Sequence, residues 1–88
     1  MKSYISEDFI TAYRNLPKKV RKQTRESYKK FKQNPQHPSL VFKKVHPPNI
    51  FSARVSLYYR VLGALDNDEI VWFWIGTHDE YDKLLSQM

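Results

Sequence analysis

The sequence predicts an α+β fold, in which an N-terminal antiparallel helical hairpin packs on a four-stranded, mainly antiparallel β-meander followed by a short C-terminal helix. Apolar residues recur with a helical period up to Gln33, and the period changes to that of strands after Pro38. An unbroken apolar run, Ile70–Ile75, indicates a strand buried on both faces. The length of 88 residues indicates one domain, residues 1–88.

The first third of the chain predicts the two helices. Lys2–Ile5 is a candidate for a short edge strand that precedes them. Ser6 is a suitable N-cap for the first helix, whose apolar stripe is Phe9, Tyr13 and Leu16. Pro17 cannot continue that helix but can begin the second, which we expect to run to Gln33. Because the connection is so short, we expect an antiparallel hairpin.

The rest of the chain predicts the four strands and the last helix. We expect the first strand at Leu40–Val45, and alternating apolar and polar residues predict two more at residues 51–56 and 58–65. The turn signal Asp66–Glu69 leads into the fourth strand, which we expect to end at Gly76. Simple alternation would place Trp72 and Trp74 together on one face of that strand. Thr77 can then cap a helix that runs to Met88.

Composition limits the class of protein. The chain has no cysteine, which excludes disulfides and thiolate zinc sites. No apolar run is long enough to span a membrane and no signal peptide is visible, so we expect a cytoplasmic protein. The net charge of +6 indicates an anionic partner, with nucleic acid first. Between residues 14 and 32 there are nine basic residues against one acid, so the candidate nucleic-acid contacts are Lys18, Lys19, Lys22 and Lys29.

Two segments carry a resemblance to a known family. FSARVSLYYRVLG (Phe51–Gly63) and VWFWIGTHDEYDKLL (Val71–Leu85), after a helical hairpin, resemble the RelE/ParE superfamily of toxins from type II toxin–antitoxin systems. The resemblance covers essentially the whole chain. It implies either a RelE-like mRNA endonuclease, which depends on the ribosome and needs no metal or cofactor, or a ParE-like inhibitor of DNA gyrase. In both branches an antitoxin neutralises the toxin.

Two arginines are the candidate phosphate ligands. Metal-free RNA cleavage uses the substrate's 2′-hydroxyl as nucleophile, and it requires a proton acceptor, a proton donor and cations around the phosphate. Arginine suits the last task because its planar fork binds two phosphate oxygens. Arg54 and Arg60 lie on neighbouring predicted strands, and the resemblance implies that both are catalytic. The simpler alternative is that both are solvated residues on the face of the sheet.

The candidate acids and bases follow from side-chain type and from the same resemblance. Histidine changes charge near neutral pH, and His78 stands where some RelE-like toxins carry a catalytic histidine. His46 is a candidate for a second acid or base, and Tyr81 for a proton donor or a base-stacking group, although a core role suits Tyr81 equally. Lys43 and Lys44 alternate faces of a strand, so only one can face the substrate. We take Lys43 as catalytic and Lys44 as a nucleic-acid contact.

The predicted function is therefore a toxin that cuts mRNA on the ribosome and inhibits translation. Two alternatives stay open: a non-catalytic inhibitor of gyrase, and a catalytically inactive relative that only binds nucleic acid. The expected partners are a cognate antitoxin, the ribosome and mRNA, with no membrane. We expect a free monomer and a hetero-oligomer with the antitoxin. The two long helices should cover one face of the tryptophan strand, and the antitoxin should bind an apolar groove on the other face, which the C-terminal helix covers only in part.

Overall fold

The computed structural model describes residues 1–88, which form three α-helices, one short 3₁₀ helix and a five-stranded sheet. The strand order in the sheet is β1-β5-β4-β3-β2. The elements in chain order are β1 (Lys2–Ile5), α1 (Glu7–Arg14), α2 (Lys18–Gln33), the 3₁₀ helix η1 (Pro38–Leu40), β2 (Lys43–His46), β3 (Ile50–Arg54), β4 (Tyr59–Asp66), β5 (Glu69–Thr77) and α3 (His78–Gln87).

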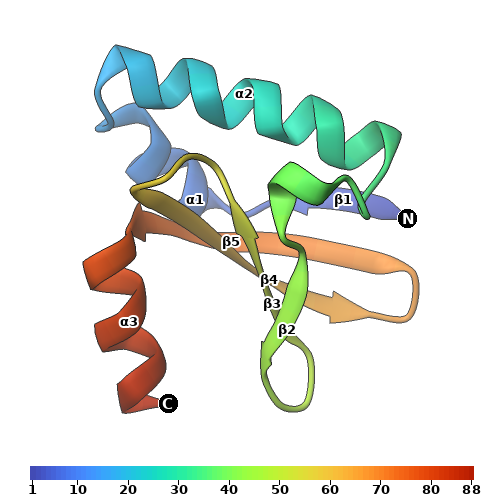
Figure 1. Cartoon of the computed structure of the whole chain (residues 1–88). Helices are drawn as coiled ribbons and strands as arrows, with labels where there is room; N and C mark the ends of the chain where they lie inside the picture. The colour runs from blue at the N-terminus through green and yellow to red at the C-terminus, as the bar shows by residue number, and fades with distance from the viewer.

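The α+β class, the meander and the C-terminal helix are confirmed, but the sheet has five strands instead of four. The additional strand is the candidate edge strand β1, which pairs in parallel with β5. The other three pairings are antiparallel. As Figure 1 shows, α1 and α2 lie on one side of the sheet and α3 lies on the other. No helix combines the length and the apolar character that crossing a membrane would require.

Local signals explain where the elements begin. The Ser6 hydroxyl accepts a hydrogen bond from the Phe9 amide at 3.1 Å and caps α1 as predicted. Helix α2 begins one residue later than expected, because Pro17 is its N-cap. The predicted strand Leu40–Val45 is wrong at its start: the chain first turns through η1, and Val41 adopts a left-handed conformation with φ 46°. Strand β2 therefore covers Lys43–His46. Strand β5 continues through Gly76 to Thr77.

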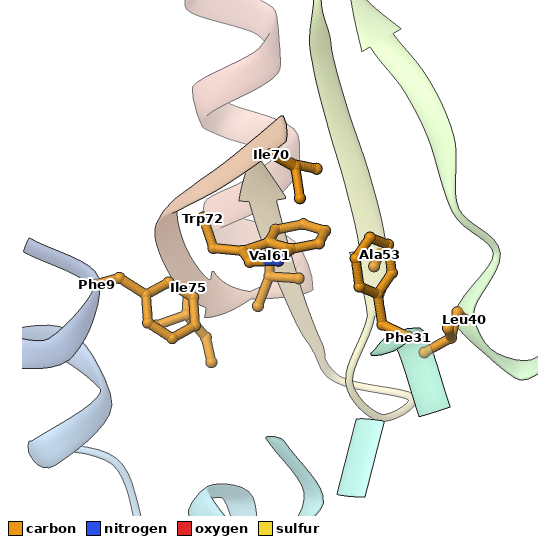
Figure 2. Packing of buried hydrophobic residues seen from close by; sticks show 8 residues of the cluster. All are labelled: Phe9, Phe31, Leu40, Ala53, Val61, Ile70, Trp72 and Ile75. Atoms are coloured by element: carbon orange, nitrogen blue, oxygen red, sulfur yellow. The ribbon is translucent and has the colours of Figure 1, made fainter. Parts of the chain in front are cut away.

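The main core lies between the sheet and the helices α1 and α2. Eight buried apolar side chains form it, and Figure 2 shows how they converge; they come from α1, α2, η1 and three strands. Aromatic rings meet edge to face at its centre, with the Phe31 ring 5.1 Å from both the Trp72 and the Phe42 ring centroids. Such pairs add stability beyond the area that they bury. A small chain thus fills its core with few residues.

A β-bulge in β5 changes which side chains share a face. Leu62 pairs with Trp74, whereas the next residue of β4, Gly63, pairs with Trp72, so Phe73 is an extra residue in β5. Trp72 is 3% exposed and faces α2, while Trp74 is half-buried on the face that carries α3. The prediction that both tryptophans lie on one face is therefore wrong, because simple alternation does not hold across a bulge.

Both glycines of the chain lie against a tryptophan ring. A Cβ added to Gly63 would lie 2.8 Å from Trp72 Cε3, and one added to Gly76 would lie 2.5 Å from Trp74 Cζ2. Neither glycine has a positive φ, so close packing and not backbone strain accounts for them. Each face of the sheet thus holds one tryptophan against one glycine.

The substitution Gly63→Ala tests this packing. The new methyl group would meet Trp72 and Ile70 within 3 Å, and overpacking of this kind costs about 1–3 kcal/mol. We expect urea unfolding to show that loss. Adding Trp72→Phe, which removes the outer ring, should make the double variant more stable than the sum of the two single effects predicts. Wild-type stability of Gly63→Ala would contradict the proposed packing.

Candidate functional site

A shallow polar pocket of about 120 Å³ opens on the α3 side of the sheet. Its lining contains three cationic side chains and no carboxylate. The lining residues are Val41, Lys43, Ser52, Arg54, Arg60, His78 and Tyr81. The structure therefore brings together five of the six predicted catalytic residues. We call this cavity the polar pocket.

The strand register explains this gathering. Ser52 and Arg54 are two residues apart on β3, so their side chains share one face. Lys43 lies opposite Ser52 on β2, and Arg60 lies opposite Arg54 on β4. His78 and Tyr81 come from the first turn of α3, which packs on the same face. One face of three adjacent strands thus supplies the cations, and the helix supplies the remaining polar groups.

The arginines of the polar pocket lie close together without an ion-pair partner. Like charges directly opposite each other in a sheet are destabilising, yet Arg54 and Arg60 form such a pair. Neither arginine forms an ion pair, since the chain contains only Met1–Asp68 and His78–Asp82. Burial, and secondly the charge of Arg54, lower the pKa of Arg60 from its ordinary value. A bound anion would relieve this repulsion.

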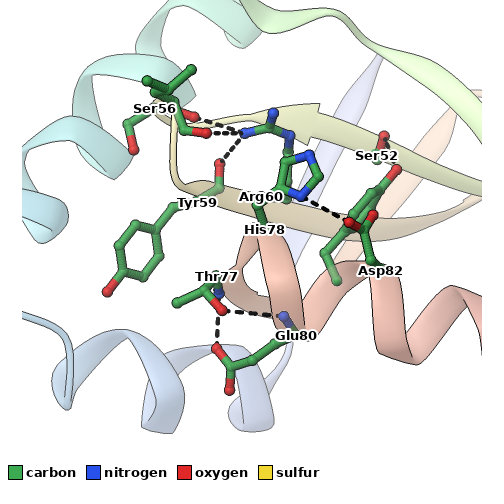
Figure 3. A network of polar contacts seen from close by, with 10 residues as sticks. Ser52, Ser56, Tyr59, Arg60, Thr77, His78, Glu80 and Asp82 are labelled. Carbon is green, nitrogen blue, oxygen red and sulfur yellow. Dashed lines mark hydrogen bonds and ion pairs between the residues drawn. The ribbon is translucent and has the colours of Figure 1, made fainter.

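The two arginines differ in what their side chains contact. Arg60 Nη1 donates to the carbonyl oxygens of Ser56 at 2.7 Å, Tyr59 at 3.0 Å and Leu57 at 3.3 Å (Figure 3). Its guanidinium therefore holds the loop between β3 and β4. Arg54 is exposed and donates no hydrogen bond from its side chain within the protein. The whole fork of Arg54 is available to a ligand.

His78 is positioned by contacts at its backbone and at its ring. Its amide donates to the Tyr58 carbonyl at 2.7 Å. Its Nδ1 lies 3.0 Å from Asp82 Oδ2, one helical turn further along α3 (Figure 3). A carboxylate at Nδ1 favours the tautomer with the proton on that nitrogen and leaves Nε2 to a substrate. The side chain is 45% exposed, so Nε2 can meet a ligand.

Tyr81 is mostly buried and forms part of the wall of the polar pocket. The residue is 8% exposed, and its hydroxyl donates to Ser52 Oγ at 3.2 Å. Its ring lies edge-on to the His78 ring, with 6.0 Å between centroids. Tyr81 thus links α3 to β3 and fixes one wall beside His78.

The other predicted residues lie outside the polar pocket. His46 does not line it, and its Nε2 lies 3.3 Å from the Met88 carbonyl oxygen. Lys44 pairs with Phe51 and so points to the opposite face from Lys43. The four candidate lysines of α2, which are Lys18, Lys19, Lys22 and Lys29, are all exposed on that helix.

Besides Val41, sequence reasoning missed two polar residues, Ser52 in the polar pocket and Asp82 beside it. Ser52 shares its face with Arg54, which the alternation of β3 was sufficient to show. Asp82 follows His78 at i+4, a spacing that brings two helical side chains together. Asp79, Asp82 and His78 also place ligand atoms within 4.8 Å of one another. Exposed acidic groups commonly lie this close, so the spacing does not identify them as metal ligands.

A second, larger cavity lies on the other side of the sheet. It has a volume of about 380 Å³ and is lined mostly by apolar side chains of α1, α2, β3 and Trp72. The predicted apolar groove is therefore misplaced. We expected the helical hairpin to cover its face of the sheet and the groove to lie elsewhere, but the groove lies between the hairpin and the sheet. We call it the apolar groove.

The start of α3 depends on a capping box. The Thr77 hydroxyl accepts from the Glu80 amide at 3.2 Å, and the Glu80 carboxylate accepts from the Thr77 amide at 2.8 Å. This backbone hydrogen bond, and secondly the Thr77 hydroxyl, lower the pKa of Glu80 below its ordinary value of 4.5. The cap fixes the helical turn that carries His78.

Thr77→Val keeps the shape of the cap and removes its hydroxyl. Losing an N-cap costs about 0.5–2 kcal/mol, and urea unfolding at pH 7 should show a loss in that range. Glu80→Gln tests the charge. A carboxylate whose pKa is lowered on folding contributes stability above its unfolded pKa and loses it as pH falls through the folded pKa. The stability difference between wild type and Glu80→Gln should thus shrink below about pH 4.5. A difference that is constant with pH would contradict the ionised cap.

Comparison with known proteins agrees with this fold. The profile of the ParE-like toxin domain matches residues 18–83, well over half of the chain. The fold resembles that of a chain in the crystal structure of the RelB–RelE antitoxin–toxin complex from Methanococcus jannaschii, with TM-score 0.71, 17% identity, and coverage of 92% of this chain and 96% of that one.

A second solved structure has a similar fold. It is a copper-bound mutant toxin from Helicobacter pylori, with TM-score 0.58, 14% identity, and coverage of 91% of this chain and 97% of that one. No curated protein sequence matches this chain. At these identities the two structures show the fold alone, and the matched profile shows the family. The chain therefore belongs to the ParE-like toxin domain family, within the RelE/ParE superfamily of toxins.

Proposed function

We propose that this toxin of a toxin–antitoxin system is an endonuclease that cuts mRNA on the ribosome without a metal ion. The single observation that carries the proposal is the polar pocket, whose lining contains three cationic side chains and a histidine but no carboxylate. An RNA phosphate carries the negative charge that would balance these cations. The 2′-oxygen bonds to phosphorus while the bond from phosphorus to the 5′-oxygen breaks. His78 accepts the 2′-hydroxyl proton at Nε2, and water gives a proton to the leaving 5′-oxygen.

Each residue has a role that fits its contacts. Arg54, whose guanidinium is free, binds two oxygens of the scissile phosphate. Lys43 adds a second positive charge, while Arg60 holds the loop between β3 and β4 and contributes its charge from there. His78 exchanges a proton at Nε2, and Asp82 orients its ring through Nδ1. Loss of one such electrostatic contact typically costs about 10²–10³-fold in rate.

Two further surfaces complete the proposal. The exposed lysines of α2 contact ribosomal RNA phosphates, which would add affinity without sequence preference. A cognate antitoxin neutralises the toxin. One of the similar structures is an antitoxin–toxin complex, and the charge of +6 suits an acidic partner.

Inhibition of DNA gyrase is the second candidate, favoured by the match to the ParE-like profile. One experiment separates the two. Purified toxin is added to ribosomes programmed with mRNA in the presence of a chelator, and separately to gyrase with relaxed plasmid. We expect mRNA cleavage and normal supercoiling. Intact mRNA together with blocked supercoiling would establish the second candidate instead.

Two neighbouring lysines allow a test of the polar pocket with a matched control. Lys43 lines it and Lys44, the next residue, points to the opposite face. In single-turnover cleavage at saturating toxin, we expect Lys43→Ala to be about 10²-fold slower, within the range for one lost electrostatic contact. Lys44→Ala should keep the wild-type rate and change only the affinity. Equal rates for the two variants would argue against a role for Lys43 in the chemical step.

Two histidines provide a matched pair for proton transfer. His78→Gln keeps polarity but cannot exchange a proton, so cleavage should slow by about 10²–10⁴-fold. His46→Gln makes the same change outside the polar pocket and should leave the rate as in wild type. If both variants cleave at the wild-type rate, His78 has a structural role only.

A further inference from the structure

The loop between β3 and β4, residues 55–58, carries the two most exposed large apolar side chains of the chain. Tyr58 is 69% exposed and Leu57 is 65% exposed, whereas no other large apolar residue exceeds 48%. Neither belongs to the core or packs against it. Exposed apolar side chains that lie together commonly mark a contact with a ligand. The fold does not account for these two, so we looked for their ligand.

The backbone of this loop is held by residues of the polar pocket. Arg60 Nη1 donates to three of its carbonyl oxygens, and the His78 amide donates to the Tyr58 carbonyl at 2.7 Å. Every carbonyl from Ser56 to Tyr59 therefore accepts a hydrogen bond from a residue that lines the pocket. Because the loop is already ordered, a ligand that contacts its side chains loses little free energy in fixing the backbone.

The pairing of β4 with β5 places Tyr58 beside the polar pocket. Tyr59 pairs with Thr77, and the hydrogen bond between the His78 amide and the Tyr58 carbonyl extends the pairing by one residue. Alternation then puts Tyr58 on the face of Arg60, two residues later, where the pocket opens. Figure 3 agrees, since the Tyr59 ring points away from the Arg60 guanidinium.

A nucleobase is the ligand that suits an exposed aromatic ring beside a phosphate site. Each nucleotide of single-stranded RNA offers a phosphate and an unstacked base, and proteins bind such bases on aromatic rings. Neither residues 55–58 nor the lining of the polar pocket contains an acid that would repel the strand. Tyr81, the tyrosine that sequence analysis considered for stacking, is 8% exposed, and its hydroxyl donates to Ser52. Tyr58 is therefore the better candidate for this contact.

We propose that Tyr58 is the base-stacking residue of this site, and that one nucleobase of the RNA strand lies on its exposed ring while the adjacent phosphate occupies the polar pocket. The proposal rests on the endonuclease function proposed above and adds a determinant of substrate preference to it. Stacking requires only a π-face, so the site accepts every base. Purines have larger rings than pyrimidines, so the site prefers purines at the stacked position.

Cleavage of mRNAs that lack a single base tests the stacking. Ribosomes are programmed with normal mRNA, or with mRNA that has an abasic nucleotide on the 5′ or the 3′ side of the cleaved bond. Single-turnover rates are measured at subsaturating toxin. With normal mRNA, Tyr58→Ala should cleave about 5–100-fold more slowly than wild type, the range for one lost base stack. With the abasic mRNA that removes the stacked base, wild type and Tyr58→Ala should cleave at the same rate.

Three controls accompany the alanine variant. Tyr58→Phe keeps the ring and should cleave at the wild-type rate. Tyr4→Ala removes another exposed tyrosine, from the edge strand β1 and outside the polar pocket, and should also cleave as wild type does. Urea unfolding should give Tyr58→Ala the stability of wild type, because the side chain that it removes is mostly exposed.

A second readout detects stacking without cleavage. An RNA with 2′-O-methyl groups cannot be cleaved through its 2′-oxygen, and a 2-aminopurine placed beside the protected bond loses fluorescence when it stacks. Wild type and Tyr58→Phe should quench this probe, both with toxin alone and on ribosomes. Tyr58→Ala should leave its fluorescence high.

Three outcomes would overturn the proposal. They are wild-type cleavage and quenching by Tyr58→Ala, equal slowing by Tyr58→Ala on normal mRNA and on both abasic mRNAs, and slowing by Tyr58→Phe as large as that by Tyr58→Ala. If wild type cleaves no mRNA but quenches the probe through Tyr58, the proposed endonuclease function fails and the stacking assignment stands. If wild type neither cleaves mRNA nor quenches the probe, both proposals fail.

Discussion

The extra residue Phe73 in β5 is the constraint on which both faces of the sheet depend. Because Leu62 and Gly63 pair with Trp74 and Trp72, the bulge turns the two tryptophans to opposite faces. Each ring then lies against a glycine, where no other residue leaves room for it. Without the extra residue, the residues after it would exchange faces. The core on one side and the support of α3 on the other would then be lost together.

The polar pocket gathers like charges, whose mutual repulsion destabilises the free protein. Two arginines lie directly opposite each other, a lysine lies nearby, and no acid is close enough to pair with Arg54 or Arg60. Nearby carboxylates would stabilise the free protein, but they would also occupy the arginine forks. Three carbonyl oxygens accept hydrogen bonds from Arg60, and the charge of Asp82 also stabilises its guanidinium. No hydrogen bond or ion pair within the protein stabilises the Arg54 guanidinium, so a bound anion would lower its free energy.

Sequence reasoning reached the elements and most of the site because both depend on local patterns. Ser6 and Thr77 are N-caps that sequence alone identifies. Alternation along β3 places Arg54 on the face that α3 covers. The parallel pairing of β1 and the bulge at Phe73 could not be predicted in this way, because both are set by contacts between distant segments. For the same reason, the contacts of Arg60 with the loop between β3 and β4 were not visible.

The dual position of Arg54 follows from where β3 ends. Within a strand, a side chain belongs to one face, because the pleat alternates from residue to residue. Arg54 is the last residue of β3, and after it the chain leaves the sheet through residues 55–58. A long side chain at such an end can reach around the edge of the sheet to both faces. A residue at this strand end therefore contributes to the linings of both cavities.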